Sequence, residues 1–199
     1  MSFDIIKEAN FFNIVGGGVL MKKLRLLGLL CAFSIVFCSN SSLLASASGN
    51  SKQRQSEVNH TMSCNYANIK VGCKYVYGAS GPDTFDCGGL VRYISKLIGV
   101  TLPSDCAAED FRQFEKKKRG YPGQSSNCKP GDYLYYQKLD KNGNVVKNGR
   151  YRDIYHASVF VGNGMIVEAS SSSDVVVKRP RSIYKTASEI GYADAATVF

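Results

Sequence analysis

The sequence is poor in the residues and segments that bind metals or span membranes. Its 199 residues include only two histidines, and no two cysteines after residue 47 have C-x-x-C spacing, so a structural zinc site fits poorly. Internal repeats and a second domain-sized segment are absent. The remaining composition, with 44% hydrophobic and 11% aromatic residues, is typical of one soluble globular domain with a core.

Residues 21–47 have the three parts of a secretory signal peptide. A basic start at 21–25 precedes an almost wholly apolar run at 26–37, and 45–47 form a small-x-small cleavage signal. We therefore expect a secreted protein. A permanent membrane anchor is the weaker alternative, because a spanning helix needs about 20 apolar residues.

Residues 1–20 precede this signal, although a signal peptide normally starts the chain. The glycines at 16–18 require G-rich codons, as a bacterial ribosome-binding site upstream of a start codon would. This predicts that translation starts at Met21 and that 1–20 are an upstream extension. After the signal, the polar residues 48–61 predict a short linker.

The net charge of +9 predicts association with anionic wall polymers. The positive charge is densest in the basic run at 116–119, which could contact such polymers. The alternative is that this run is a solvated helix end or loop. No nucleic-acid-binding motif accompanies the charge, so nucleic acid is not an expected partner.

The cysteines that follow the signal are odd in number, which leaves one thiol unpaired in an exported protein. If Cys87 is that thiol, the others allow three disulfide pairings that the sequence does not rank. These others are Cys64, Cys73, Cys106 and Cys128.

Apolar spacing predicts helices in the first half of the domain and strands in the second. Residues 90–98 carry one apolar stripe at helical spacing that stops at Gly99. A short helix is expected within 64–77, and another over 105–117 with Ser104 as its cap. Strands are expected at 133–136, 155–161, 165–169, 175–177 and near 196–198. Helices followed by an antiparallel sheet make an α+β fold.

Cys87 opens the strongest predicted helix. A helix N-terminus lowers the pKa of a thiol by placing partial positive charge beside the sulfur, and its free N–H groups can hold an oxyanion. Such a nucleophile needs a base. We choose His156, which falls inside a predicted strand, over His60, which falls in the polar linker where a solvated side chain is expected.

Glu168 is the candidate partner of His156. If the Gly-Asn-Gly turn before Met165 is a three-residue loop, Val161 pairs with Met165 and Glu168 pairs with Ser158, on the face that carries His156. A carboxylate there would accept the second imidazole N–H and fix its tautomer. A two-residue Asn-Gly turn would put Glu168 on the opposite face, and a merely exposed glutamate is the alternative.

Three motifs together resemble one family. The stretch YVYGASGPDTFDCGGLVRYISKLIGVTLPSD is similar to the signature of the NlpC-type bacterial cell-wall endopeptidases, which are papain-like cysteine enzymes. CKPGDYLYY resembles that family's P-G-D strand, and HASVFVGNGMIVEAS resembles its histidine hairpin. The motifs occur in the family's order and cover most of 62–199. The resemblance implies a papain-like domain there, with N-terminal helices packed on an antiparallel sheet.

By this resemblance, Cys87 is the catalytic nucleophile and His156 is its base. Glu168 takes the third polar position, where His, Asn or Gln is more common. Tyr75 corresponds to the tyrosine near the oxyanion site.

The same resemblance implies two substrate-binding positions. Asp86 corresponds to an aspartate that helps to recognise the free amine of a stem peptide. Gly88 replaces the serine that assists it, so we expect this position to affect substrate choice. Ala79 replaces the second glycine of the family's usual pair.

The function implied by the resemblance is a secreted cysteine endopeptidase that hydrolyses peptidoglycan stem peptides. The expected bond joins γ-linked D-glutamate to the following diamino acid, and the expected route is a thioester acyl-enzyme. This chemistry requires no cofactor and no metal. Two alternatives stay open: a peptidoglycan amidase or acyl transferase with the same triad, and a non-catalytic secreted wall-binding module.

Overall fold

The computed structural model describes residues 40–102, 106–184 and 186–196. Contacts between Cα atoms divide the chain into Met1–Ser42 and Leu43–Phe199, and the features discussed below belong to the second unit. The predicted upstream extension and most of the predicted signal peptide lie outside the described residues. In the part that is described, no helix is long and apolar enough to cross a membrane.

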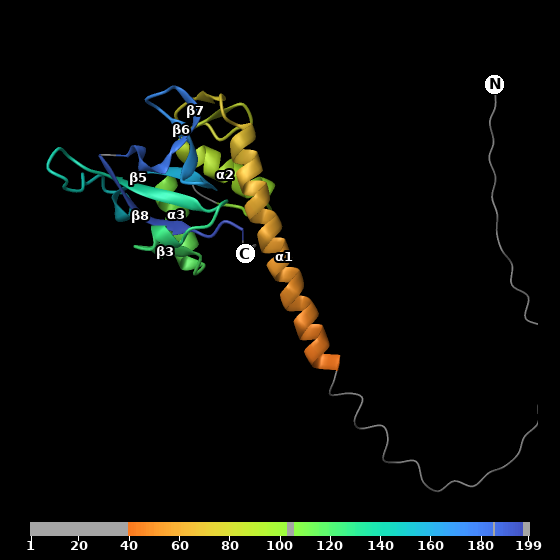
Figure 1. Cartoon of the computed structure of the whole chain (residues 1–199). Helices are drawn as coiled ribbons and strands as arrows, with labels where there is room; N and C mark the ends of the chain where they lie inside the picture. The colour runs from red at the N-terminus through yellow and green to blue at the C-terminus, as the bar shows by residue number, and fades with distance from the viewer. Residues whose placement is uncertain (1–39, 103–105, 185, 197–199) are drawn as a thin grey trace, which may run out of the picture. The chain divides into compact units, whose positions relative to one another are not determined.

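The architecture is a papain-like α+β fold (Figure 1). Two short strands of its eight-stranded sheet, Lys74–Tyr75 and Thr84–Phe85, precede the helix that starts at Cys87, and the other strands follow the helix that ends at Lys116. The strand order is β2-β1-β7-β6-β5-β4-β8-β3, and all named neighbours run antiparallel except β1 and β2. The elements are α1 Asn40–Ile69, β1 Lys74–Tyr75, β2 Thr84–Phe85, α2 Cys87–Leu97, α3 Ala107–Lys116, β3 Gly120–Pro122, β4 Tyr133–Lys138, β5 Ile154–Gly162, β6 Met165–Ser170, β7 Val175–Pro180 and β8 Ala187–Ala193.

The predicted helix that opens at Cys87 is confirmed as α2. The second predicted helix is confirmed as α3, whose N-cap is Cys106; the expected cap Ser104 lies outside the described residues. The basic run at 116–119 starts at the last residue of α3 and is largely exposed, as expected for a solvated helix end.

The predicted strands from 133 to 177 are confirmed as β4, β5, β6 and β7. The strand expected near 196–198 is wrong at Ala196, which lies in a turn, and the residues after it lie outside the described part. The sequence also did not predict the short strands β1, β2 and β3 or the longer strand β8, which lies between β4 and β3. The sequence of β8 has no alternating apolar pattern, so pairing with β4 rather than local preference makes it a strand.

β4 divides the core into two clusters because its buried side chains alternate between the faces of the sheet. Tyr133 and Tyr135 pack with the residues of α2 and α3 in the larger cluster. Leu134 and Tyr136 pack with Ile166 on the other face. The sheet is therefore covered on both faces at β4. His156 pairs with Tyr136, so its side chain lies on the same face as Tyr136.

The cysteines form no disulfide among the described residues. Cys64, Cys73, Cys87, Cys106 and Cys128 all lie outside disulfides, so none of the predicted pairings is present. Cys64 donates a hydrogen bond to the carbonyl of Phe160, and Cys128 accepts one from Arg181.

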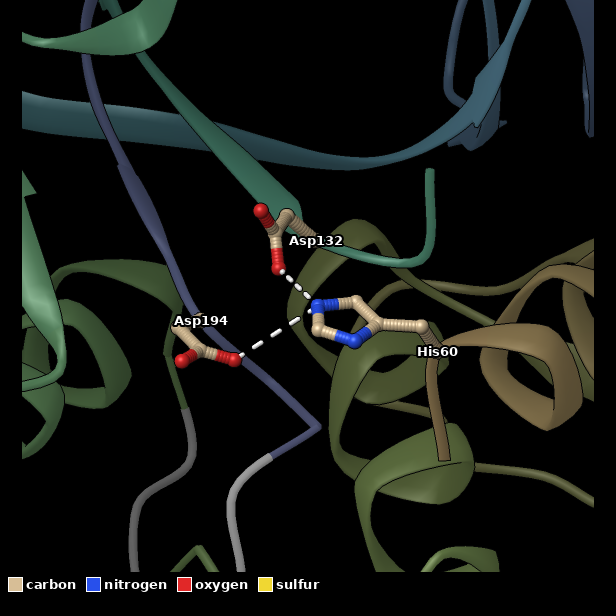
Figure 2. A group of neighbouring side chains, drawn as sticks. All are labelled: His60, Asp132 and Asp194. Carbon is tan, nitrogen blue, oxygen red and sulfur yellow. Dashed lines mark hydrogen bonds and ion pairs between the residues drawn. The ribbon is translucent and has the colours of Figure 1, made fainter. Parts of the chain in front are cut away.

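Residues 48–61, predicted as a linker, are helical and belong to α1. The expectation that His60 is solvated is wrong. Its side chain is 16% exposed, and Nε2 lies 2.9 Å from Asp132 Oδ1 and 3.6 Å from Asp194 Oδ1 (Figure 2). His60 therefore ties α1 to the start of β4 and the end of β8.

The hydrogen bonds of His60 indicate a protonated ring. Nδ1 lies 3.0 Å from the carbonyl oxygen of Ser56, which can only accept, and Nε2 faces two carboxylates, which also only accept when ionised. Burial lowers the pKa of His60, but the hydrogen bond and charge of Asp132 and the charge of Asp194 outweigh it, so this pKa is raised. His60 Nε2 and one carboxylate oxygen each of Asp132 and Asp194 lie within 4.8 Å of one another, a spacing that a metal ion could also use. A proton on Nε2 accounts for the same contacts.

We expect His60→Gln to destabilise the protein by about 1 to 3 kcal/mol near pH 6, because a buried hydrogen bond to a charged group is lost. The loss should shrink as the pH rises through the pKa of folded His60. The raised pKa means that the folded state holds a proton that the unfolded state releases above about pH 6.5.

Urea unfolding of the wild type and the variant near pH 6 and near pH 9 measures this difference. Lys52→Gln, at an exposed position on the same helix, is the matched control and should show no pH-dependent change. A His60→Gln effect of the same size at both pH values would contradict the assignment.

Candidate active site

Asp86 fixes the start of α2 and therefore the position of Cys87. Its Oδ1 accepts the N–H of Gly89 at 2.6 Å, as an N-cap does, and its Oδ2 accepts the N–H of Gly78 at 2.9 Å. The preceding loop is thereby tied to the helix end. Gly89 is required there, because a Cβ would lie 1.9 Å from the carbonyl oxygen of Ala79. The Cys87 N–H belongs to the first helical turn, whose N–H groups have no partner within the helix.

Cys87 and His156 are brought together from α2 and β5. Burial raises the pKa of the Cys87 thiol, but the charge of His156 and a hydrogen bond with it outweigh burial, so this pKa lies below its ordinary value. The charge of Asp86 opposes this effect, and the backbone of Ala157 adds to it through a further hydrogen bond. A thiol in this state can serve as a nucleophile near neutral pH.

The hairpin of β5 and β6 brings Glu168 to His156 by a route that differs from the expected one. The predicted pair of Val161 with Met165 is wrong: Gly162 pairs with Met165. The loop is a two-residue turn in which Asn163 and Gly164 both have positive φ, 52° and 67°, as a type I′ turn requires.

A bulge compensates for this shorter turn. The register shifts by one residue between Phe160 and Gly162, so that Val159 pairs with Val167. Glu168 therefore lies level with Ser158, on the face that carries His156, as the three-residue loop had predicted. A two-residue turn alone would place Glu168 on the opposite face. The bulge shifts the register by one further residue and returns Glu168 to the face of His156.

Glu168 is fully buried and its carboxylate contacts three side chains. His156 Nε2 lies 2.6 Å from Oε2, the hydroxyl of Tyr184 donates to the same oxygen, and Arg179 forms an ion pair with Oε1. Because Nε2–H is used by Glu168, Nδ1 is the imidazole nitrogen left for Cys87. The sequence did not single out Tyr184 or Arg179. The available signal for Arg179 was its position on β7, two residues after Val177, which pairs with Glu168.

Tyr75 lies near Cys87, the predicted nucleophile. Burial, and then the charge of Cys87, raise the pKa of the Tyr75 hydroxyl. The hydroxyl therefore stays protonated at neutral pH, as a donor to an oxyanion must.

Asp86 and Gly88, the two predicted substrate-binding positions, meet at Arg92. The guanidinium of Arg92 lies 3.9 Å from Asp86 and 3.4 Å from the buried carboxylate of Asp110. A Cβ at position 88 would lie 2.9 Å from Arg92 Nη1 and 3.1 Å from the Ala107 nitrogen. Gly88 thus leaves the space that Arg92 uses, and the Asp86 carboxylate, 11% exposed, is largely occupied by protein partners.

Comparison with known proteins identifies the family. A model described as the NlpC/P60 family matches residues 72–192. The chain belongs to the NlpC/P60 family. A Bacillus subtilis protein named gamma-DL-glutamyl hydrolase is 34% identical over 109 residues, which cover 54% of this chain and 22% of the relative. A Listeria monocytogenes protein named probable endopeptidase p60 is 28% identical over 102 residues, covering 51% of this chain and 17% of the relative.

The matched part therefore spans about a fifth of the length of these relatives. Among solved structures, NlpC2 from Trichomonas vaginalis aligns with a TM-score of 0.53 and 25% identity, covering 68% of this chain and 45% of the other. The peptidoglycan hydrolase RipB from Mycobacterium tuberculosis aligns with a TM-score of 0.53 and 22% identity, covering 70% and 66%. Both likenesses support the NlpC/P60 fold.

We expect iodoacetamide to alkylate Cys87 faster than Cys64 and Cys128 near pH 6.5, because the lowered pKa of Cys87 gives it a larger thiolate fraction than theirs. Burial raises the pKa of Cys64 and of Cys128, which makes them internal references. Peptide mass mapping over time gives each rate. His156→Gln should slow Cys87 about tenfold or more and leave Cys64 unchanged; an unchanged Cys87 rate would remove His156 from its assigned place.

We expect Gly88→Ser to destabilise the protein by about 1 to 2 kcal/mol near pH 8, because the new side chain displaces Arg92 from Asp110. Burial, against the opposing charge of Arg92, raises the pKa of Asp110 to about 7. Near pH 6 Asp110 is mostly neutral, so the loss should be smaller there. Urea unfolding at both pH values tests this, with Gly49→Ser, which has open space around its Cβ, as control. An equal loss at both pH values would contradict the role of Asp110.

Proposed function

We propose that this protein is a secreted cysteine endopeptidase that hydrolyses peptidoglycan stem peptides. The contact of Cys87 with His156, whose second nitrogen is held by Glu168, carries the proposal. The relatives named endopeptidase and gamma-DL-glutamyl hydrolase support the reaction class. The latter name favours a bond to a γ-linked glutamate, and we propose the bond between γ-linked D-glutamate and the following diamino acid.

The reaction begins when the Cys87 thiolate attacks the carbonyl carbon of that bond. The Cys87 N–H and the hydroxyl of Tyr75 stabilise the negative oxygen of the tetrahedral intermediate. His156 gives its Nδ1 proton to the departing amine, the C–N bond breaks, and a thioester to Cys87 remains.

Water completes the cycle. His156 Nδ1 takes a proton from the water as it attacks the thioester, and the thiolate leaves as the acid product forms. Throughout, Glu168 holds Nε2–H and stabilises the imidazolium state. The steps use these side chains, the Cys87 N–H, the peptide bond of the substrate and one water molecule.

Location outside the cell follows from residues 21–47, whose pattern supports export. The chain after residue 47 stays basic, which supports contact with anionic wall polymers. Together, the export signal and the charge support a location at the cell wall.

Digestion of purified peptidoglycan tests the proposal. The wild type should release fragments that end in γ-linked D-glutamate, and Cys87→Ala should release less than about a thousandth as much, because the nucleophile is lost. Mass analysis of the fragments identifies the bond. Cys64→Ala, which removes a thiol outside the site, should retain wild-type activity.

Other products identify the alternatives. Separation of glycan from peptide would indicate an amidase, and a new amide bond in the products would indicate an acyl transferase. Binding to peptidoglycan without release of fragments would indicate a wall-binding module. Equal release by the wild type and Cys87→Ala would end the cysteine mechanism.

A further inference from the structure

We propose that Arg179 and Tyr184 are positioning residues, which act through Glu168 to set the charge and orientation of His156. The inference deepens the proposed function and rests on it for the substrate. Its evidence is the arrangement of four side chains from β5, β6, β7 and the segment that follows β7.

Burial makes Glu168 dependent on a cation. The side chain is fully buried, and a carboxylate removed from water is costly unless it is paired. Arg179 supplies the pair. β6 and β7 are antiparallel with Glu168 opposite Val177 and Ile166 opposite Arg179, so Arg179 is a diagonal neighbour of Glu168 on the same face of the sheet.

Tyr184 holds the other end of the carboxylate. Its hydroxyl donates to Oε2, the oxygen that also faces His156 Nε2. Its ring lies 4.8 Å from the ring of Tyr136 and 5.8 Å from that of His156, measured between centroids, and the Arg179 guanidinium lies 5.5 Å from its centroid. Tyr184 therefore fixes the carboxylate and packs beside the imidazole that the carboxylate orients.

The two contacts have one consequence at the nucleophile. An ionised Glu168 accepts Nε2–H and stabilises the imidazolium, whose charge in turn favours the Cys87 thiolate. Without Arg179, burial favours the neutral carboxyl form of Glu168. The imidazolium then loses its partner charge, and the thiolate becomes less populated at a given pH.

The deciding measurement is the pH profile of Cys87 alkylation by iodoacetamide, which needs no substrate. In Arg179→Met the acid limb of the profile should move to higher pH, and the rate near pH 6.5 should fall about tenfold. Arg179→Lys, which keeps the charge, should restore at least half of the shift. Lys178→Met removes a cation from the same strand that bonds Asn68 instead, and it should leave the profile unchanged.

A double-mutant cycle tests whether the effect passes through Glu168. In a Glu168→Gln background, Arg179→Met should change the rate by less than about twofold, because there is no charge left to hold. Tyr184→Phe, which retains the ring, should lower kcat on peptidoglycan about three- to tenfold with KM unchanged. Thermal unfolding and circular dichroism of each variant check that it is folded.

The outcomes separate this proposal from the proposed function. A shifted profile in an enzyme that does not cleave peptidoglycan would support the positioning role and refute the substrate. An unchanged profile, a shift to lower pH, or an Arg179→Met effect of full size in the Glu168→Gln background would overturn the positioning role, whatever the substrate. If Arg179→Met does not fold, Arg179→Gln, which also removes the charge, takes its place with the same expected shift. An unchanged profile in Arg179→Gln together with a wild-type kcat in Tyr184→Phe would refute the proposal.

Discussion

The carboxylate of Asp86 is the constraint on which the geometry of the site depends. It accepts one N–H from α2 and one from the loop before it, so a single side chain sets the start of the helix and the path of the chain into it. Phe85, the residue before this cap, is fully buried in the core and anchors the chain there. The Cys87 thiol is therefore presented by a helix end that is fixed on both sides.

Charges of alternating sign extend from this helix end to both sides of the nucleophile. On one side, Arg92 lies between Asp86 and the buried Asp110. On the other side, His156 is followed by Glu168 and Glu168 by Arg179. Burial and the charge of Asp86 raise the pKa of Cys87, and His156 lowers it. The pKa of the thiol therefore depends on its neighbours and not on the helix N-terminus alone.

The histidine hairpin shows how far local sequence reasoning extends. The pattern of 155–169 predicted two strands and a turn, and both strands are present. The pattern could not predict the turn length or the bulge separately. A turn shorter by one residue and a bulge each shift the strand register by one residue, so only their combined effect decides which face Glu168 occupies. That combined effect leaves Glu168 buried against His156 of the same hairpin and against Arg179 and Tyr184, which lie on other segments.

Other differences have the same origin. The polar residues 48–61 carry no apolar periodicity that would predict a helix packed on a domain, yet α1 is held there by His60, Asp132 and Asp194. β8 carries no alternation, yet it lies between two strands that pair with it. Both depend on partners about 50 or more residues away along the chain, which a local window does not contain.

The sequence by itself determined the fold class, the helix that begins at Cys87, the strands of the hairpin and the family signature. These depend on local periodicity, turn residues and short motifs, which are readable within about 30 residues. The tertiary structure decided which histidine faces the thiol, how Glu168 is held in its charged state and why position 88 has no side chain. Those answers depend on Arg179, Tyr184 and Arg92, whose roles exist only once distant segments are packed together and removed from water.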